Sequence, residues 1–359
     1  MNQTEIQNHD ARALANYRKG NLLILLATVA VIFISAKSLR AGNLYWDGNA
    51  ATAGVGGSGT WANTNFSTNS TGGGTLQRAS TSDTIFFNAA SGGASGNIFT
   101  IASASTWGSS ASTNIGTMTF NSDYVFQVTG STTTTINLNA ITIAANTKLS
   151  LSNSPTLAFV ANVASNGATI SGAGASSVLS MDQITGSSTD FKRVTIDRVT
   201  ITNLSINLSG AGAGGYKGFV VSAGTSTIGA NITNNTTDAL VLGANSGTTL
   251  NLYGVVSGSG RVSFASGASG GAGTYNLYSA NTYTGNTEIN GGTNSVYRLQ
   301  INNALSTVAL LQHGTVSGQG GAIDLNGFNQ TVAGLSGTTA GMGRMTNSAA
   351  GLSTLTVNQ

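Results

Sequence analysis

The sequence predicts an all-β protein built as a solenoid, in which the chain coils and each coil lays its strands on the previous one. Three observations favour this fold. Only 7 % of the 359 residues are charged, and Gly, Ser, Thr and Asn dominate the composition. Short stretches of alternating apolar and polar residues recur, as is typical of strands. Helical periodicity is absent after the N-terminal segment, and in the second half the alternating stretches begin at residues 250, 262, 275, 289, 299, 308 and 323, too close together for intervening helices.

Stacked sandwiches of antiparallel strands also fit this rhythm, but a solenoid explains more of the composition. Stacked coils bring like residues into register about 4.8 Å apart, so Thr and Asn side chains pair well there, whereas repeated charges would repel one another. Each coil also needs its backbone donors for its neighbours. This accounts for the single proline, Pro155, which we expect at a turn. Known solenoid repeats suggest about 20 to 25 residues per coil.

Residues 1–41 are expected to be an export signal. A basic pair at 18–19 precedes an apolar run over 22–36, and the small residue Ala41 offers a cleavage position before Gly42. The run is shorter than the roughly 20 residues that span a bilayer comfortably, which favours a cleaved signal peptide. An uncleaved signal anchor stays an alternative, because a long leader precedes the basic pair and basic residues also follow the run. With either form, we expect the chain after residue 41 to lie outside the cytoplasm.

The basic character of the chain comes from this segment. The formal net charge is +3 and the pI is near 9.2. Residues 1–41 contain five basic and two acidic side chains, so the rest of the chain contains nine of each. A protein that neutralises phosphates needs clustered Lys and Arg, so we expect no nucleic-acid partner. The absence of cysteine excludes disulfides, thiolate metal sites and cysteine nucleophiles.

Residues 42–245 are expected to form the N-terminal part of the solenoid, with an aromatic-rich cap. Its alternating stretches include 118–120, 126–128, 136–138, 199–201 and 204–208. The aromatic residues near its start are Tyr45, Trp46, Trp61 and Trp107. We expect them to cover the apolar core at the open N-terminal end, as terminal repeats of solenoids must. Stacking on sugar rings is the alternative role.

Residues 246–359 carry the most specific strings. These are LNLYGVVSGSG at 250–260, YNLYSA at 275–280, NTYTGNTEINGG at 281–292, LQINNALS at 299–306 and DLNGFNQTVAGLSG at 324–337. The succession resembles the autotransporter-associated β-strand repeat, also called the passenger-associated transport repeat. LYWDG at 44–48, GTW at 59–61 and DTIFF at 83–87 also look like the start of proteins that carry such repeats. Residues 100–245 match only in composition.

This resemblance implies a right-handed parallel β-helix that belongs to an exported, bacterial surface or secreted protein. Gly-rich insertions at 266–273 and 315–321 depart from the repeat. The repeats stop at Gln359, where such proteins continue, and the last segment carries neither the strand pattern of a C-terminal β-barrel nor a hydrophobic anchor. We therefore expect the repeat region to be truncated at its C-terminal end.

The sequence contains one concentrated ionic stretch. Its members are Asp182, Asp190, Lys192, Arg193, Asp197 and Arg198. Coil stacking could bring two of its carboxylates onto one face, the arrangement that polysaccharide hydrolases use. A solvated strand face or a polar turn ladder is the simpler interpretation, because the charges of both signs are interleaved.

Other motifs are weaker. His313 is the only histidine after residue 41 and is expected to lie exposed at a turn. The remaining acids are spaced singly, and no calcium-binding nonapeptide is present. The stretch 210–215 fits G-x-G-x-x-G, with Asp238 about twenty residues further on, but no helix follows it and a dinucleotide site is not expected. Lys217 is preceded by Tyr216 rather than by the glycine of a phosphate loop.

The sequence thus predicts an exported, non-catalytic surface or secreted protein, structural or adhesive, with no catalytic residue, cofactor or metal ion. A carbohydrate-active enzyme on the same scaffold and a glycan-binding module that uses the N-terminal aromatics are the alternatives. Surface glycans or other cell-surface proteins are the expected partners, and a membrane is contacted only through residues 1–41 if these are retained.

Overall fold

The computed structural model describes residues 42–48, 56, 58–60, 66–71, 76–77, 83–88, 97–102, 112–129, 134–153, 157–161, 167–182, 191–208, 215–265, 272–315, 318–337 and 342–358. Residues 42–359 form one compact unit. The expected signal segment, Pro155, Trp61, Trp107 and Asp190 lie outside the described residues. No helix occurs in the described part of the chain, and hence none there is long and apolar enough to cross a membrane.

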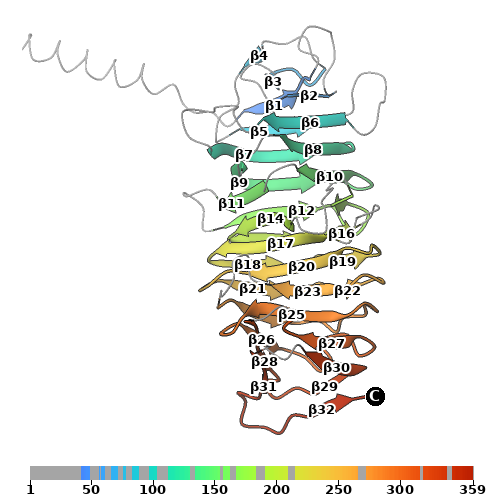
Figure 1. Ribbon diagram of the computed structural model, residues 1–359. Helices are drawn as coiled ribbons and strands as arrows, with labels where there is room; N and C mark the ends of the chain where they lie inside the picture. Colours follow the sequence, from blue (N-terminus) through green and yellow to red (C-terminus); the bar gives the residue numbers. More distant parts are fainter. Residues whose placement is uncertain are drawn as a thin grey trace, which may run out of the picture. The chain divides into compact units, whose positions relative to one another are not determined.

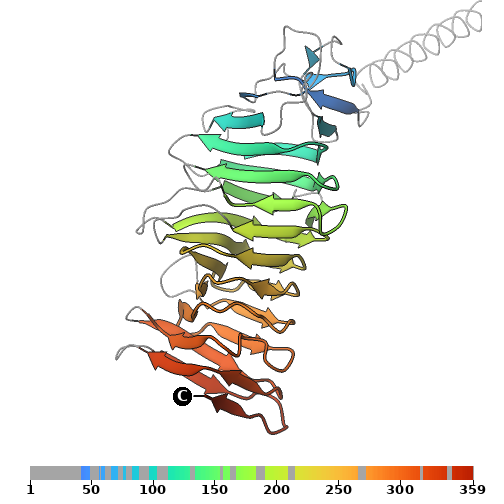
Figure 2. The same ribbon diagram turned by 90° about the vertical axis from the view of Figure 1, so that its right-hand side faces the viewer.

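The described strands stack in three ladders of parallel strands (Figures 1 and 2). The first face contains β11 (Leu157–Ala161), β14 (Phe191–Asp197), β17 (Tyr216–Ala223), β20 (Ala239–Ala244), β23 (Val262–Ala265), β25 (Thr287–Gly292), β27 (Leu310–His313) and β30 (Gly334–Gly337). The second face contains β1 (Asn43–Trp46), β5 (Thr84–Phe87), β12 (Ala168–Gly172), β15 (Val199–Thr202), β18 (Thr225–Ile228), β21 (Thr249–Leu252), β24 (Thr274–Leu277), β26 (Val296–Leu299), β28 (Gln319–Asp324) and β31 (Met342–Thr346). The long strands β7 (Ser112–Phe120) and β9 (Thr134–Ile143) take part in both faces.

The third face is a separate eight-stranded sheet. It contains β2 (Gly59–Thr60), β6 (Asn97–Ala102), β8 (Tyr124–Thr129), β10 (Lys148–Asn153), β13 (Val178–Ser180), β16 (Ser205–Leu208), β19 (Asn231–Asn234) and β22 (Val256–Ser257). Further along the chain, β29 (Gln330–Val332) pairs with β32 (Leu355–Val357). Successive strands belong to the three faces in turn, although the coils that contain β23 to β26 add no strand to the third face, and the prediction of a parallel β-helix is confirmed.

The register gives the length of a coil. Phe219, Leu242, Phe264, Ile289, His313 and Gly337 are successive partners on the first face, so these coils use 22 to 25 residues. The strands on both sides of residue 245 belong to the same ladders. The expected coil length therefore holds across the C-terminal half.

Alternation places one side of each strand in a continuous apolar core. In β21 and β24 the pattern is half-buried, buried, half-buried, buried, with Leu250, Leu252, Tyr275 and Leu277 inside. At the N-terminal end the core is aromatic: Trp46 is fully buried against Phe66, Phe87 and Phe99. The short strand β3 (Phe66–Ser67) pairs with β1 in the antiparallel direction, and β4 (Leu76–Gln77) pairs with β3, again antiparallel. Trp46 therefore contributes to the core as expected for a cap residue.

Side-chain ladders connect the coils, as the composition predicts. Asn276 donates to Asn251 at 2.9 Å, Gln300 donates to Asn276 at 3.4 Å, and Asn326 donates to Gln300 at 3.4 Å. Where the third face lacks a strand, side-chain amides replace the backbone ladder: Asn281 accepts from the Val256 N–H at 2.7 Å and donates to the Ala304 carbonyl at 2.5 Å. Neutral amides suit these positions because they both donate and accept.

Most predicted strands are present, within a few residues of their expected starts. The main error is at 299–301, since β26 ends at Leu299 and a turn with Asn303 at a φ of 54° follows. Asn tolerates this left-handed conformation better than most residues, so the apolar Ile301 lies on a turn and is 39 % exposed. Alternation over three residues does not distinguish such a turn from a strand.

Candidate functional site

The first face differs from the second because the outer side of several of its strands is also buried. All residues of β20, β23 and β25 are buried, including the outward-facing Val241, Ser263 and Glu288. Val241 packs there with Val220 and Ala265 in a small second apolar cluster. Buried polar groups beside it must find partners within the protein. We call the polar residues of this side, from Lys217 to Thr315, the outer tract.

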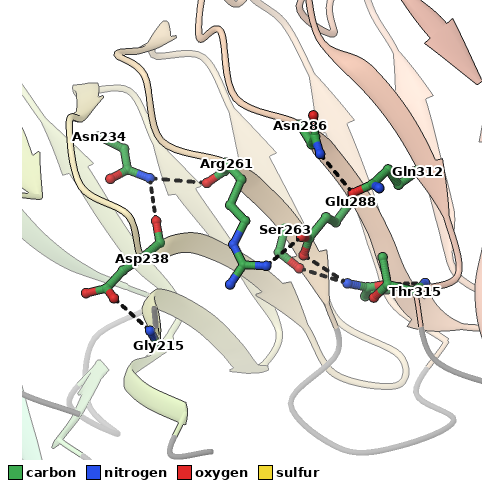
Figure 3. Close-up of polar contacts among 10 residues, drawn as sticks. Gly215, Asn234, Asp238, Arg261, Ser263, Asn286, Glu288, Gln312 and Thr315 are labelled. Carbon is green, nitrogen blue, oxygen red and sulfur yellow. Dashed lines mark hydrogen bonds and ion pairs between the residues drawn. The ribbon is translucent and has the colours of Figure 1, made fainter. Parts of the chain in front are cut away.

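The upper part of the outer tract is a buried ion pair between neighbouring coils. Lys217 Nζ lies 2.9 Å from Asp238 Oδ2, and the two side chains are 4 % and 1 % exposed. Asp238 Oδ1 accepts from the Gly215 N–H at 2.7 Å. Asn234 donates to the carbonyls of Asp238 and Arg261, each at 3.1 Å, and so joins three segments of chain (Figure 3).

The lower part is organised by Glu288. Arg261 Nη1 lies 3.0 Å from Glu288 Oε1, and Asn290 donates to Oε2 at 3.2 Å. Asn290 also donates to Ser263 at 3.2 Å and accepts from the Thr315 hydroxyl at 2.8 Å. Ser263, Glu288 and Thr315 are labelled in Figure 3. The Arg261 guanidinium in addition lies 5.0 Å from the ring centroid of Tyr216, a cation–π distance.

The tract ends at a pocket of about 260 Å³ that is lined by Gln312, His313, Gly314, Thr315, Ser336 and Gly337. Gln312 accepts from Asn286 at 3.2 Å. His313 is half-buried in β27 at the register position of Phe264 and Ile289, and its ring lies directly against Gly343. The expectation of an exposed turn histidine is therefore wrong. Burial lowers the pKa of His313, because the imidazolium loses hydration there.

The chemistry available to the tract is limited by these pairings. Glu288 and Asp238 each have a cation within 3.0 Å, so both carboxylates are engaged in contacts between coils. In the described part of the chain no three His, Asp, Glu or Cys side chains gather as a metal site. The side chains that line the pocket are polar: the Gln312 amide, the hydroxyls of Thr315 and Ser336, and the His313 imidazole.

The ionic stretch selected from the sequence is divided by the fold. Asp182 follows β13 on the third face and pairs with Lys148 at 3.0 Å, whereas Asp197 ends β14 on the first face and pairs with Arg198 at 3.0 Å. Burial alone would raise the pKa of Asp182, but bonds from Lys148 and two serines lower it overall. Lys192 and Arg193 belong to β14, and Arg193 is half-buried rather than fully solvated.

The aromatic residues proposed for sugar stacking also separate. Trp46 is 0 % exposed and cannot contact a ligand without unfolding the cap. Tyr45 is half-buried and stacks on Phe86 with ring centroids 5.3 Å apart. The exposed aromatic residue of the described structure is instead Tyr253, which is 49 % exposed and which sequence reasoning missed.

The spacing between the glycine motif and Asp238 has a structural explanation. Residues 209–214 lie outside the description, but Gly215 contacts Asp238 because the two are one coil apart. Arg261 and Glu288 also come from neighbouring coils, although they are 27 residues apart. A search for oppositely charged residues about 20 to 25 positions apart would have found Lys217 and Asp238 from the sequence, but not Arg261 and Glu288.

Comparisons with known proteins give no further identification: no family model, no curated protein and no solved structure matches this chain. The class of protein defined by the fold is a parallel β-helix.

Proposed function

We propose that this chain is an exported, non-catalytic surface or secreted β-helix protein with a structural or adhesive role, similar to the passenger regions that carry autotransporter-associated β-strand repeats. The proposal is supported by how the coils use their charged residues. Among the described ion pairs, Lys148–Asp182, Lys217–Asp238, Arg261–Glu288 and Arg298–Asp324 all join strands or turns of neighbouring coils.

Asp324 is the clearest example of a charged residue that connects coils. Arg298 of the preceding coil lies 2.9 Å from Oδ2, and Ser348 of the following coil donates its hydroxyl at 2.7 Å and its N–H at 2.9 Å. Burial would raise the pKa of Asp324, but these bonds lower it overall, so the carboxylate stays charged. A group held in this way connects three coils. Such use of charge suits a scaffold that must keep its repeats stacked.

Two experiments test the proposal. N-terminal sequencing of the exported protein should give Gly42 as the first residue; an intact N-terminus would show a signal anchor, and cytoplasmic retention would refute export. Incubation of the full chain with neutral and acidic polysaccharides should release no fragments. Cleavage that is lost in Glu288→Gln or in Asp190→Ala/Asp197→Ala would overturn the non-catalytic assignment in favour of the carbohydrate-active alternative.

A further inference from the structure

Two tyrosines form a rigid aromatic platform at the corner between the second and third faces. Tyr253 follows β21, which is labelled in Figure 1, and Tyr278 follows β24, one coil further along. Their ring centroids are 4.0 Å apart and the rings are parallel within 6°. The neighbouring hydroxyl of Tyr253 raises the pKa of Tyr278. The pair therefore presents a fixed flat surface.

The backbone holds this surface in place. The Ser279 hydroxyl donates to the Tyr253 carbonyl. The Tyr253 N–H donates to the Ile228 carbonyl at 2.8 Å, which fixes the turn against the preceding coil. Gly254 approaches Ala230 so closely that a Cβ would overlap the Ala230 carbonyl oxygen. A preorganised aromatic surface loses little entropy on binding, because its rings are already fixed.

The stack ends at Tyr253. The corresponding position in the preceding coil is Gly229, since Ile228 is the partner of Leu252. In the coil that follows Tyr278, the corresponding position is Gln300, whose amide belongs to the asparagine ladder. Tyr253 is 49 % exposed, and no side chain extends from Gly229 to cover the side of its ring that faces the preceding coil.

The polar groups on the strands that carry the platform are uncharged, and Arg298 of the following coil, the register partner of Asn276, is paired with Asp324 at 2.9 Å. Asn231 is exposed, and its Oδ1 accepts from the Val255 N–H at 3.0 Å. Asn251 and Asn276 stand on the adjacent strands. A flat aromatic surface flanked by amides fits a pyranose ring, whose C–H face packs on the aromatic ring while its hydroxyls bond to the amides. A nucleobase would also stack, but nucleic-acid sites add a track of cations, which these residues do not supply.

We infer that Tyr253 and Tyr278 form a subsite for a neutral glycan. This site rests on the proposed adhesive role and gives it a ligand class. It lies apart from the outer tract of the first face, so binding here is independent of any chemistry there.

The experiment is a titration of the full chain with cellohexaose and laminarihexaose, followed by calorimetry and by product analysis of the same mixtures. Saturable binding without cleavage is expected. Tyr253→Ala should weaken it at least about tenfold, whereas Tyr253→Phe, which keeps the ring, should retain it. Gly229→Leu, which adds a side chain beside the ring, should also weaken binding. Val308→Ala, at a residue that is 60 % exposed elsewhere, is the matched control.

Several results would overturn the subsite. These are no saturation by either sugar up to about 10 mM, binding that Tyr253→Ala leaves unchanged, or binding of oligothymidylate in place of the sugars. Circular dichroism of each variant shows whether the coils remain folded. Cleavage of the sugars would instead refute the non-catalytic role, so failure of the subsite and failure of the proposed function are distinguishable.

Discussion

The buried ion pair between Lys217 and Asp238 allows a quantitative test of how the coils are held together. At the observed separation of 2.9 Å, the attraction is about 6 kcal/mol at an effective dielectric constant of about 20. Removing both charged groups from water costs several kcal/mol for each ion, so the intact pair contributes little net stability. Removing only one partner leaves the other charge buried and unpaired. An unpaired buried charge lowers the free energy of unfolding by several kcal/mol.

Lys217→Met should therefore lower the free energy of unfolding by about 3 to 5 kcal/mol. Asp238→Asn should cost a similar amount, because it leaves the ammonium group of Lys217 without its counter-ion. The double variant Lys217→Met/Asp238→Asn has no buried charge and should lie within about 2 kcal/mol of the unchanged protein. Lys148→Met is the control, since the pair of Lys148 and Asp182 is 45 % and 15 % exposed. It should cost less than about 1 kcal/mol.

The assay is urea denaturation of the purified chain, followed by both circular dichroism and tryptophan fluorescence. Coincident transitions show that one cooperative unit is being measured, which is not guaranteed in a repeat protein. The reasoning is refuted if Lys217→Met costs less than about 1 kcal/mol, or if the double variant loses the sum of the two single losses. Either result would mean that the pair is more hydrated than its burial indicates.

Two further predictions concern the core and a turn. Tyr275, Tyr283 and Tyr297 are buried, and burial raises the pKa of Tyr283 to about 12 and those of the other two above the ordinary value of 10. Because the folded chain keeps these protons where the unfolded chain releases them, the free energy of unfolding should fall as pH rises from 10 towards 12. The urea midpoint measures this fall. A midpoint that does not change with pH, or a fall that Tyr283→Phe does not reduce, would contradict the raised pKa of the buried tyrosines. Gly254→Ala should cost about 1 to 3 kcal/mol, since its Cβ would overlap the Ala230 carbonyl, whereas Gly229→Ala, whose nearest contact is 3.4 Å, should be nearly neutral in the same assay.

The strand positions were largely predictable because alternation is a local property. Val199, Ile201, Leu250 and Leu252 fall on the buried side of their strands, as their period of two requires. His313 was not predictable in this way. Its neighbours Gln312 and Gly314 suggest a turn, but the register with Ile289 places it among core positions.

The candidate site was less predictable than the fold. The sequence drew attention to Asp182 and Asp197 because they are close along the chain, yet they belong to different faces. Arg261 and Glu288 are far apart along the chain and are in contact. In a β-helix, residues become neighbours through stacking, so closeness in sequence is a poor guide to a shared site.

The sequence by itself determined an all-β chain with a low charge, balanced after residue 41, because these follow from composition and local period. The expected coil of about 20 to 25 residues was taken from known solenoid repeats. Only the tertiary structure decided which residues meet between coils. Coils of 22 to 25 residues differ in length through their turns, and a slip of one residue would exchange the inner and outer sides of a strand. The stacking of Tyr253 on Tyr278 and the burial of Lys217 against Asp238 both depend on that register.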